Sequence, residues 1–487
     1  MVLFLIGLGI LLLGGFVYGK YCERVFGPDD RETPAVKLAD GVDYVGMKKW
    51  RNQLIELLNI AGTGPILGPI QGILFGPIAF LTIPIGCVLA GSLHDYFVGM
   101  ISMRNDGAQV PKLVTRYLGN GTNKVYNIII WILMLLTGVV FIYTPGDLIV
   151  NDVLGLDIHG NVIWIVYACI LLYYILATLF PIDTIIGRIY PIFGGFLIVS
   201  ALGVLVGVLM DGGASLHPIT EGGLISVHPT GQSFIPVFFI TVACGIMSGF
   251  HGSQATLISR TVMDEREGRQ TFYNMMLAEG FIAMVWAAGA MVLFNRSAAV
   301  DTSATLMVGL ISKEFMGKIG GLIAIIGVIV LPITSGDTAF RSLRLMIAEQ
   351  FKIDQQKKIK RVFLSIVIFI PAAAILYYAK SNSEGFATLW RYFGFANQLV
   401  AVFALLMVST YLKGNGKNYF ISLLPGMFYT FIVSSYIFHD PKLGLNFDGR
   451  LGLEGYTGSY LVGLVFALLF AWFVAYSAKK RKDMILD

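Results

Sequence analysis

Long apolar segments alternate with short polar loops over the whole chain. A span needs about 17 to 25 apolar positions to cross a bilayer, and a window of about 19 residues predicts thirteen such spans. They are expected at residues 2–18, 53–76, 77–103, 124–150, 162–181, 185–210, 234–260, 272–295, 320–341, 362–378, 386–412, 418–438 and 460–477. The pattern therefore predicts an all-α integral membrane protein.

The composition supports this interpretation. Apolar residues make up 56% of the chain and charged residues only 13%, whereas soluble domains carry about 25% charged residues. Residues 1–18 lack both a basic leading segment and a small-residue cleavage site, so we expect a retained span and not a signal peptide. The four cysteines have no CxxC spacing and predict neither a disulfide framework nor a metal site.

The basic residues predict how the chain is oriented. Of the 35 Lys and Arg residues, 28 fall in the loops and tail on one side of the predicted spans. Because basic residues concentrate on the cytoplasmic side, we expect an external N-terminus and a cytoplasmic C-terminal tail, residues 479–482. The predicted location is the cytoplasmic membrane, crossed many times.

The second span is interrupted by glycine and proline. Residues 59–76 read NIAGTGPILGPIQGILFG, and each proline removes a backbone donor, so carbonyls and amides near the break lose their helical partners. Such a break at membrane depth must face protein or a wet cavity, and its half-helix ends attract ions or anionic groups. The alternative interpretation is that these glycines only permit close helix packing and form no binding site. The candidate substrate-binding residues here are Ala61, Gly62, Thr63, Gly64, Pro65 and Gly68.

The seventh span contains a second glycine-rich stretch, ACGIMSGFHGSQATLISR, at residues 243–260. We expect the backbone to open around His251, between Gly249 and Gly252, so that Ser248, His251 and Gln254 meet substrate. Helix packing is an equally weighted alternative, because this stretch lacks proline.

Five spans separate the starts of the two interrupted spans, which predicts two copies of opposite orientation. We therefore expect inverted repeat one at residues 53–210, and an external loop with inverted repeat two at residues 211–412. Residues 1–52 would add one helix and a cytoplasmic loop. Residues 413–487 would add two helices and the basic tail.

Several strings resemble signature segments of the carbon starvation protein A family: NIAGTGPILGPI, AGSLHDYFVGMISMRNDG, ACGIMSGFHGSQ, PITSGDTAFR and LWRYFGFANQLVA. The chain is similar to the shorter members, and it lacks the paired histidines that longer members carry before the first break, where it reads QLIELLN. The resemblance implies a five-plus-five, leucine-transporter-like fold. It also implies uptake of pyruvate or of peptides, driven by an ion gradient.

Ionisable side chains inside a span cost at least about 2.5 kcal/mol each, so each is a functional hypothesis. Glu56 either holds a proton or cation or lies at the cytoplasmic interface near Arg51. Asp95 follows His94, which titrates near neutral pH, although adjacent side chains on a helix point about 100° apart. Glu279 is interpreted as a lone packed acid. The polar pair Asn397 and Gln398 is interpreted as bridging helices.

The end of the ninth span is rich in oxygen. Thr334, Ser335 and Asp337 could bind sodium together with carbonyls of the first break, since hard cations prefer oxygen ligands. An ion pair between Asp337 and Arg341, one helical turn apart, is the alternative. We expect proton coupling, with sodium left open, and the candidate ion-coupling residues are Glu56, Asp95, Thr334, Ser335 and Asp337.

Other classes of function lack their motifs. No Walker A, HExxH, GxSxG or CxxCH pattern is present, so we expect no enzyme, cofactor or metal site, and no nucleic acid as partner. The predicted function is secondary uptake of a small carboxylate such as pyruvate with a coupling cation. Peptide uptake is the first alternative and a non-transporting nutrient sensor the second. Contact with membrane lipid is expected, and the oligomeric state stays open.

Overall fold

A computed structural model describes the chain except residues 42, 180–182, 298–301, 355–356, 443 and 482–487. The described part consists of helices joined by loops, with an isolated parallel bridge between Met47 and Val262. Nine of its helices are long and apolar enough to cross a membrane, or ten with one bent pair, and two shorter apolar helices cover Val162–Thr178 and Gly194–Met210. The all-α membrane architecture is confirmed, while the count of thirteen spans stays a prediction.

The helices that build the bundle follow in chain order. They are α1 (Val2–Phe16), α2 (Tyr18–Phe26), α4 (Lys49–Ile60), α5 (Gly64–Gly72), α6 (Ala79–Gly86), α7 (Ser92–Arg104), α8 (Val110–Leu118), α9 (Asn120–Leu148), α10 (Val162–Leu179), α11 (Asp183–Met210), α12 (Phe239–Thr241), α13 (Ala243–Ile246), α14 (Gly249–Ile258), α15 (Asn274–Ser297), α16 (Ala304–Gln350), α17 (Lys358–Ser381), α18 (Gly385–Gly414), α19 (Phe420–His439) and α21 (Thr457–Lys480).

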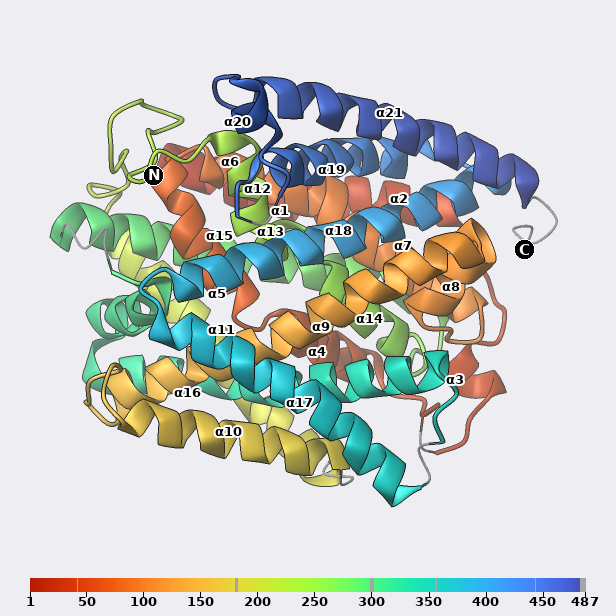
Figure 1. Cartoon of the computed structure of the whole chain (residues 1–487), viewed down its shortest axis with the longest axis horizontal. Coiled ribbons are helices and arrows are strands. Elements are labelled where there is room, and N and C mark those ends of the chain that lie inside the picture. Colours follow the sequence, from red (N-terminus) through yellow and green to blue (C-terminus); the bar gives the residue numbers. More distant parts are fainter. Residues whose placement is uncertain (42, 180–182, 298–301, 355–356, 443, 482–487) are drawn as a thin grey trace.

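The long helices run side by side across Figure 1, with the N-terminus near one end of the bundle and the end of α21 at the other. α19 and α21 pack together along one edge, and α10 lies at the opposite edge. The long helix α16 packs against both α9 and α11. The short helices of the two interrupted segments lie between these layers.

The first interruption occurs where the sequence predicts it. α4 ends at Ile60 and α5 begins at Gly64, and the two axes are bent by 49°. Ala61 leaves the helical conformation (φ −78°, ψ 52°). Pro65 lies in the first turn of α5, where its missing N–H removes no helical hydrogen bond.

The second interruption lies at Met247 and Ser248, both in extended conformation, between α13 and α14. The expectation that the backbone opens at His251 is wrong, because His251 lies inside α14. The reason is a tertiary contact. The Asn397 Oδ1 atom of α18 accepts hydrogen bonds from the Phe250 N–H (3.0 Å) and the Ser248 hydroxyl (3.1 Å), so it caps α14 three residues earlier.

The two interrupted segments cross in close contact. A Cβ added at Gly64 would lie 2.3 Å from Cys244 Cβ, and one added at Gly68 would lie 2.9 Å from the Thr241 carbonyl oxygen. Only glycine lets α5 approach α12 and α13 this closely. The Trp390 indole N–H also donates to the Thr241 carbonyl (3.0 Å), which ties α18 to the same crossing.

Candidate functional site

A buried group of acids and imidazoles lies beside the crossing. The Asp95 carboxylate of α7 lies 2.7 Å from His94 Nδ1 through one oxygen and 3.2 Å from His251 Nδ1 of α14 through the other. All three side chains are at most 1% exposed. His94 therefore contacts the adjacent Asp95, although neighbouring positions on a helix diverge by about 100°. The structure brings His251 and Asp95 together as partners.

Two glutamates from other helices complete this acid–imidazole cluster, defined here as Glu56, His94, Asp95, His251 and Glu279. Glu279 Oε2 of α15 lies 3.5 Å from His251 Nδ1, and its carboxylate interacts electrostatically with Asp95 and Glu56. The Glu56 side chain is fully buried among protein atoms, and its two interpretations, as a proton or cation carrier and as an interfacial residue, both stay predictions. Neither glutamate has a hydrogen-bond partner within the described part of the chain.

Glu279 was missed as a functional candidate by sequence reasoning. The sequence shows Glu279 as an acid in the middle of an apolar span. That position alone does not distinguish a structural carboxylate from a functional one. Only the packing of α15 beside α4, α5 and α7 shows that three carboxylates share one buried space.

Glycine again sets the approach of the helices. A Cβ at Gly252 would lie 3.2 Å from His94 Cε1, so α14 packs directly on the His94 ring. Thr63 at the break and Ser92 of α7 are buried hydroxyls without a hydrogen-bond partner in the described residues. These hydroxyls are polar groups that a ligand could satisfy.

The remaining candidates of the second break have different surroundings. Ser248 donates to Asn397 and thereby braces the break, whereas Gln254 is buried in α14 at 2% exposure. Asn397 and Gln398 connect α18 to the second interrupted segment, because the Gln398 amide donates to the Phe239 carbonyl (2.5 Å). Their predicted role of bridging helices agrees with these contacts.

The oxygen-rich end of the ninth predicted span lies in α16. Asp337 accepts hydrogen bonds from Tyr173 of α10 (3.1 Å) and from Thr338 (3.0 Å), and Thr334 donates to its own helix at Leu331. Ser335 is buried without a hydrogen-bond partner among the described residues. The described residues include no group of three or more His, Cys, Asp and Glu that could hold a metal ion.

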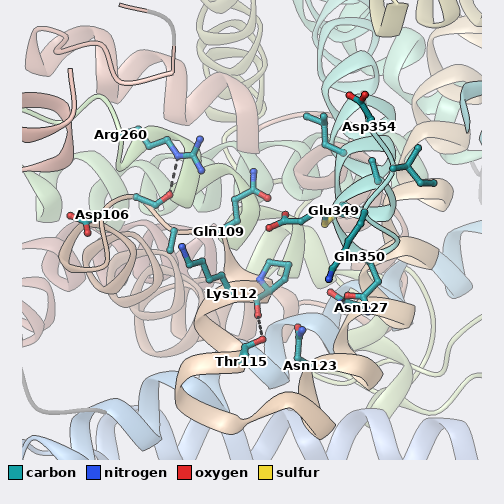
Figure 2. A pocket seen from close by; sticks show the side chains of 18 of the residues that line it. Asp106, Gln109, Lys112, Thr115, Asn123, Asn127, Arg260, Glu349, Gln350 and Asp354 are labelled. Carbon is teal, nitrogen blue, oxygen red and sulfur yellow. Dashed lines mark hydrogen bonds between the residues drawn. The ribbon is translucent and has the colours of Figure 1, made fainter. Parts of the chain in front are cut away.

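A vestibule of about 770 Å³ opens at the end of the bundle predicted to be cytoplasmic. Figure 2 shows Gln109, Lys112, Arg260 and Glu349 around it. A narrow space of about 20 Å³ also touches Gln109, and Ser253 of α14 lines it. The vestibule therefore leads toward the second interrupted segment.

Aromatic and charged side chains pack together at the other end of the bundle. Lys380 Nζ of α17 lies 2.7 Å from Asp147 Oδ1 of α9, and 4.9 Å from the centre of the Tyr143 ring. Phe386 stacks on Tyr143 (4.7 Å), and the Trp390 ring lies 5.9 Å from Phe386. This layer reaches from the ion pair to the crossing of the interrupted segments.

Comparison with known sequences identifies relatives along most of the chain. The family model described as carbon starvation protein CstA matches residues 1–155, 145–307 and 287–435. An uncharacterized membrane protein of Haemophilus influenzae is 40% identical over 57% of this chain and 87% of its own length. The peptide transporter CstA of Helicobacter pylori is 24% identical over 82% of this chain and 75% of its own length. That of Escherichia coli is 27% identical over 57% of this chain and 48% of its own length.

Solved structures show the same fold at low sequence identity. A manganese transporter of Eremococcus coleocola, in complex with an aromatic bis-isothiourea substituted compound, aligns with a TM-score of 0.58 over 92% of this chain and 99% of its own, at 13% identity. A mutant of that transporter aligns with a TM-score of 0.56 over 89% of this chain and 94% of its own.

Proposed function

The chain belongs to the carbon starvation protein CstA family, and we propose that it is a secondary transporter that takes up a small carboxylate together with protons. The observation that carries the proposal is the Asp95 carboxylate held between His94 and His251 beside Glu279. The family relatives named peptide transporters and the transporter fold of the solved structures support it.

The acid–imidazole cluster suits proton coupling because its charge depends on the protons it holds. Three carboxylates and two imidazoles share a space closed to solvent, and an unpaired buried charge costs several kcal/mol. Protons must therefore enter or leave when helix movements change which groups are paired. His251 sits on α14 and Asp95 on α7, so movement of the second interrupted segment changes their pairing directly.

Sodium coupling has weaker support. The two Asp337 carboxylate oxygens already accept hydrogen bonds from Tyr173 and Thr338, which directs this carboxylate toward α10. A sodium ion bound by Thr334, Ser335 and Asp337 would have to replace those donors. Proton coupling is therefore the proposal, and sodium is an outcome of the test below.

The substrate carboxylate is proposed to bind at the start of α5, beside the break at Ala61, Gly62 and Thr63 and the first helical residues Gly64 and Pro65. The unpartnered Thr63 hydroxyl and the Gly64 N–H supply donors for an anion, whereas the Ile66 and Leu67 N–H groups already donate to the Thr63 carbonyl. Gly68 serves mainly the contact with Thr241, so its role is to hold the two segments together.

Alternating access requires two halves that move against each other. We propose inverted repeats at residues 53–210 and 234–412 around this site, with the helices of residues 1–52 and 413–487 outside the core. Two contacts support the proposed orientation. Met1 lies against Gly213 of the proposed external loop, and Arg481 lies against Gly119 of a proposed cytoplasmic loop. The proposed location is the cytoplasmic membrane, with the N-terminus outside and the C-terminus in the cytoplasm.

Peptide uptake is the second candidate, and two observations favour it. The relatives from Helicobacter pylori and Escherichia coli are named peptide transporters. The vestibule is also large, and its lining carries both signs of charge, positive from Lys112 and Arg260 and negative from Asp106 and Glu349. Such a lining matches the amino and carboxylate ends of a short peptide.

The test is uptake into proteoliposomes of labelled pyruvate or labelled dipeptide, under an imposed proton or sodium gradient. We expect accumulation with an inward proton gradient in sodium-free buffer. Glu279→Gln should abolish this accumulation but retain exchange of labelled for unlabelled substrate, because exchange needs no net proton movement. The matched control is Glu384→Gln, an exposed acid. Accumulation that persists with sodium after the proton gradient has been collapsed would contradict proton coupling.

A further inference from the structure

A long apolar groove runs along the outer surface of the bundle between α6 and α19. Its volume is about 710 Å³, and its walls are almost entirely hydrocarbon. Ile85 of α6 and Leu424 of α19 line it and are 44% and 62% exposed. Because both helices belong to the membrane-spanning part, this groove opens toward the lipid and not toward water.

The floor of the groove rests on the second interrupted segment. Phe239 of α12 and Tyr429 of α19 both line it, and their rings lie 6.2 Å apart. Gly86 of the same lining packs so closely on α13 that an added Cβ would lie 2.3 Å from Ile246 Cγ2. Whatever fills the groove therefore contacts the segment that carries His251 farther along the chain.

One mouth of the groove is aromatic and basic. Phe420 lines the groove and stacks on Tyr419 (4.5 Å), and Lys413 Nζ lies 4.1 Å from the centre of the Tyr419 ring. Tyr18 also lines this mouth, and Lys20, two residues later in α2, is exposed. Aromatic side chains with lysines at one end of an apolar surface are typical of the headgroup level of a membrane.

Hydrogen bonds join α2 to the segment just before α19 at this mouth. The Asn418 amide donates to the Tyr21 hydroxyl (2.6 Å), and Lys417 donates to the Phe26 carbonyl. Lys20 precedes Tyr21 directly, and Lys413 lies five residues before Asn418. Lys413 Nζ therefore lies at this mouth, over the Tyr419 ring, and Lys20 is an exposed residue of the adjoining helix α2.

We propose that the groove binds an anionic phospholipid, with an acyl chain between α6 and α19 and the phosphate near Lys20 and Lys413. The apolar walls match the acyl chain, and the two lysines supply the charge complementarity that a zwitterionic lipid would not use. The bound chain contacts Phe239, so the lipid stabilises the present position of the second interrupted segment.

The test is native mass spectrometry of the full-length chain in detergent, titrated with phosphatidylglycerol or with phosphatidylcholine of the same acyl chains. We expect phosphatidylglycerol to bind at least about fivefold more tightly, the effect of one lysine near an anionic headgroup. The variant Lys20→Gln/Lys413→Gln should lose this preference. The matched control Lys479→Gln/Lys480→Gln, in the distant tail, should keep it.

Two further arms separate the acyl chain from the headgroup. Ile85→Trp fills the groove and should weaken binding of both lipids, whereas soluble glycerol phosphate should not compete with phosphatidylglycerol. Equal binding of the two lipids, or an unchanged preference in Lys20→Gln/Lys413→Gln, would overturn the proposal. Competition by glycerol phosphate would overturn it as well, because the headgroup alone would then account for binding and the groove would contribute nothing to the affinity. None of these readouts depends on transport.

Discussion

Lys380 and Asp147 form an ion pair that is almost completely buried, with 4% and 2% of their side chains exposed and 2.7 Å between Nζ and Oδ1. The Tyr167 hydroxyl donates to the same carboxylate oxygen, also at 2.7 Å. The pair joins the end of α17 to the end of α9. It lies on the side of the bundle opposite the vestibule.

Removing one partner of this pair should be costly. Lys380→Met leaves the Asp147 charge buried and unpaired, so we expect the free energy of unfolding to fall by about 3 to 5 kcal/mol. Lys380→Met/Asp147→Leu should recover most of this loss, because no charge is left behind. Thermal unfolding in detergent measures both variants.

The control is the pair of Lys442 and Glu384, which has the same 2.7 Å separation but exposed side chains. Lys442→Met should leave stability almost unchanged, because an exposed ion pair contributes little. Equal effects at the buried and the exposed lysine would show that burial does not determine the cost.

Filling the contact between the interrupted segments should abolish transport. Gly64→Leu or Gly68→Leu places a side chain where an added Cβ alone would lie 2.3 Å from Cys244 or 2.9 Å from the Thr241 carbonyl oxygen. Uptake should be lost while the protein still reaches the membrane. Gly9→Leu is the control, because no atom lies within 4 Å of a Cβ added there. Normal uptake by the Gly64 and Gly68 variants would mean that the break only permits packing.

Acid should destabilise the loop that covers Phe75. Burial, and secondly the charge of Arg391, lower the pKa of His228 to about 4. His228 Nδ1 accepts a hydrogen bond from the Thr230 N–H (3.2 Å), and its ring lies 4.5 Å from Phe75. Protonation at Nδ1 would break that hydrogen bond.

The sign follows from the lowered pKa. Between pH 6.5 and about 4 the unfolded loop binds a proton that the folded loop does not, so stability falls as the pH falls. The loss is at most about 3 kcal/mol, reduced by solvent at the loop surface. Hydrogen exchange of residues 224–232 at pH 5 and pH 7 measures it. His228→Leu should remove the difference between the two pH values.

Sidedness is testable with single cysteines in a Cys169→Ser background, since Cys169 is itself exposed. Leu154→Cys should react with an impermeant reagent added outside whole cells, and Lys352→Cys should react only after the membrane is opened. This pattern follows from the distribution of basic residues. The reverse pattern would invert the whole orientation.

The sequence alone determined the features that depend on local chemistry. Apolar spans follow from composition, and the first break follows from Pro65, which cannot continue α4 because it has no N–H and its ring clashes with the preceding turn, whereas Pro69 lies inside α5. The motifs of residues 59–76 and 243–260 also indicated the family. These inferences needed no knowledge of which helices are neighbours.

The tertiary structure decided everything that depends on contacts between distant segments. The second break lies at Met247 and Ser248 because Asn397, 147 residues from Phe250, caps α14. Glu279 joins Asp95 and His251 only because α15, α7 and α14 pack around one buried space. The same local sequence can place a buried side chain against apolar neighbours or against a polar partner. The neighbouring helix decides which of the two occurs, and the pattern along one segment does not reveal that helix.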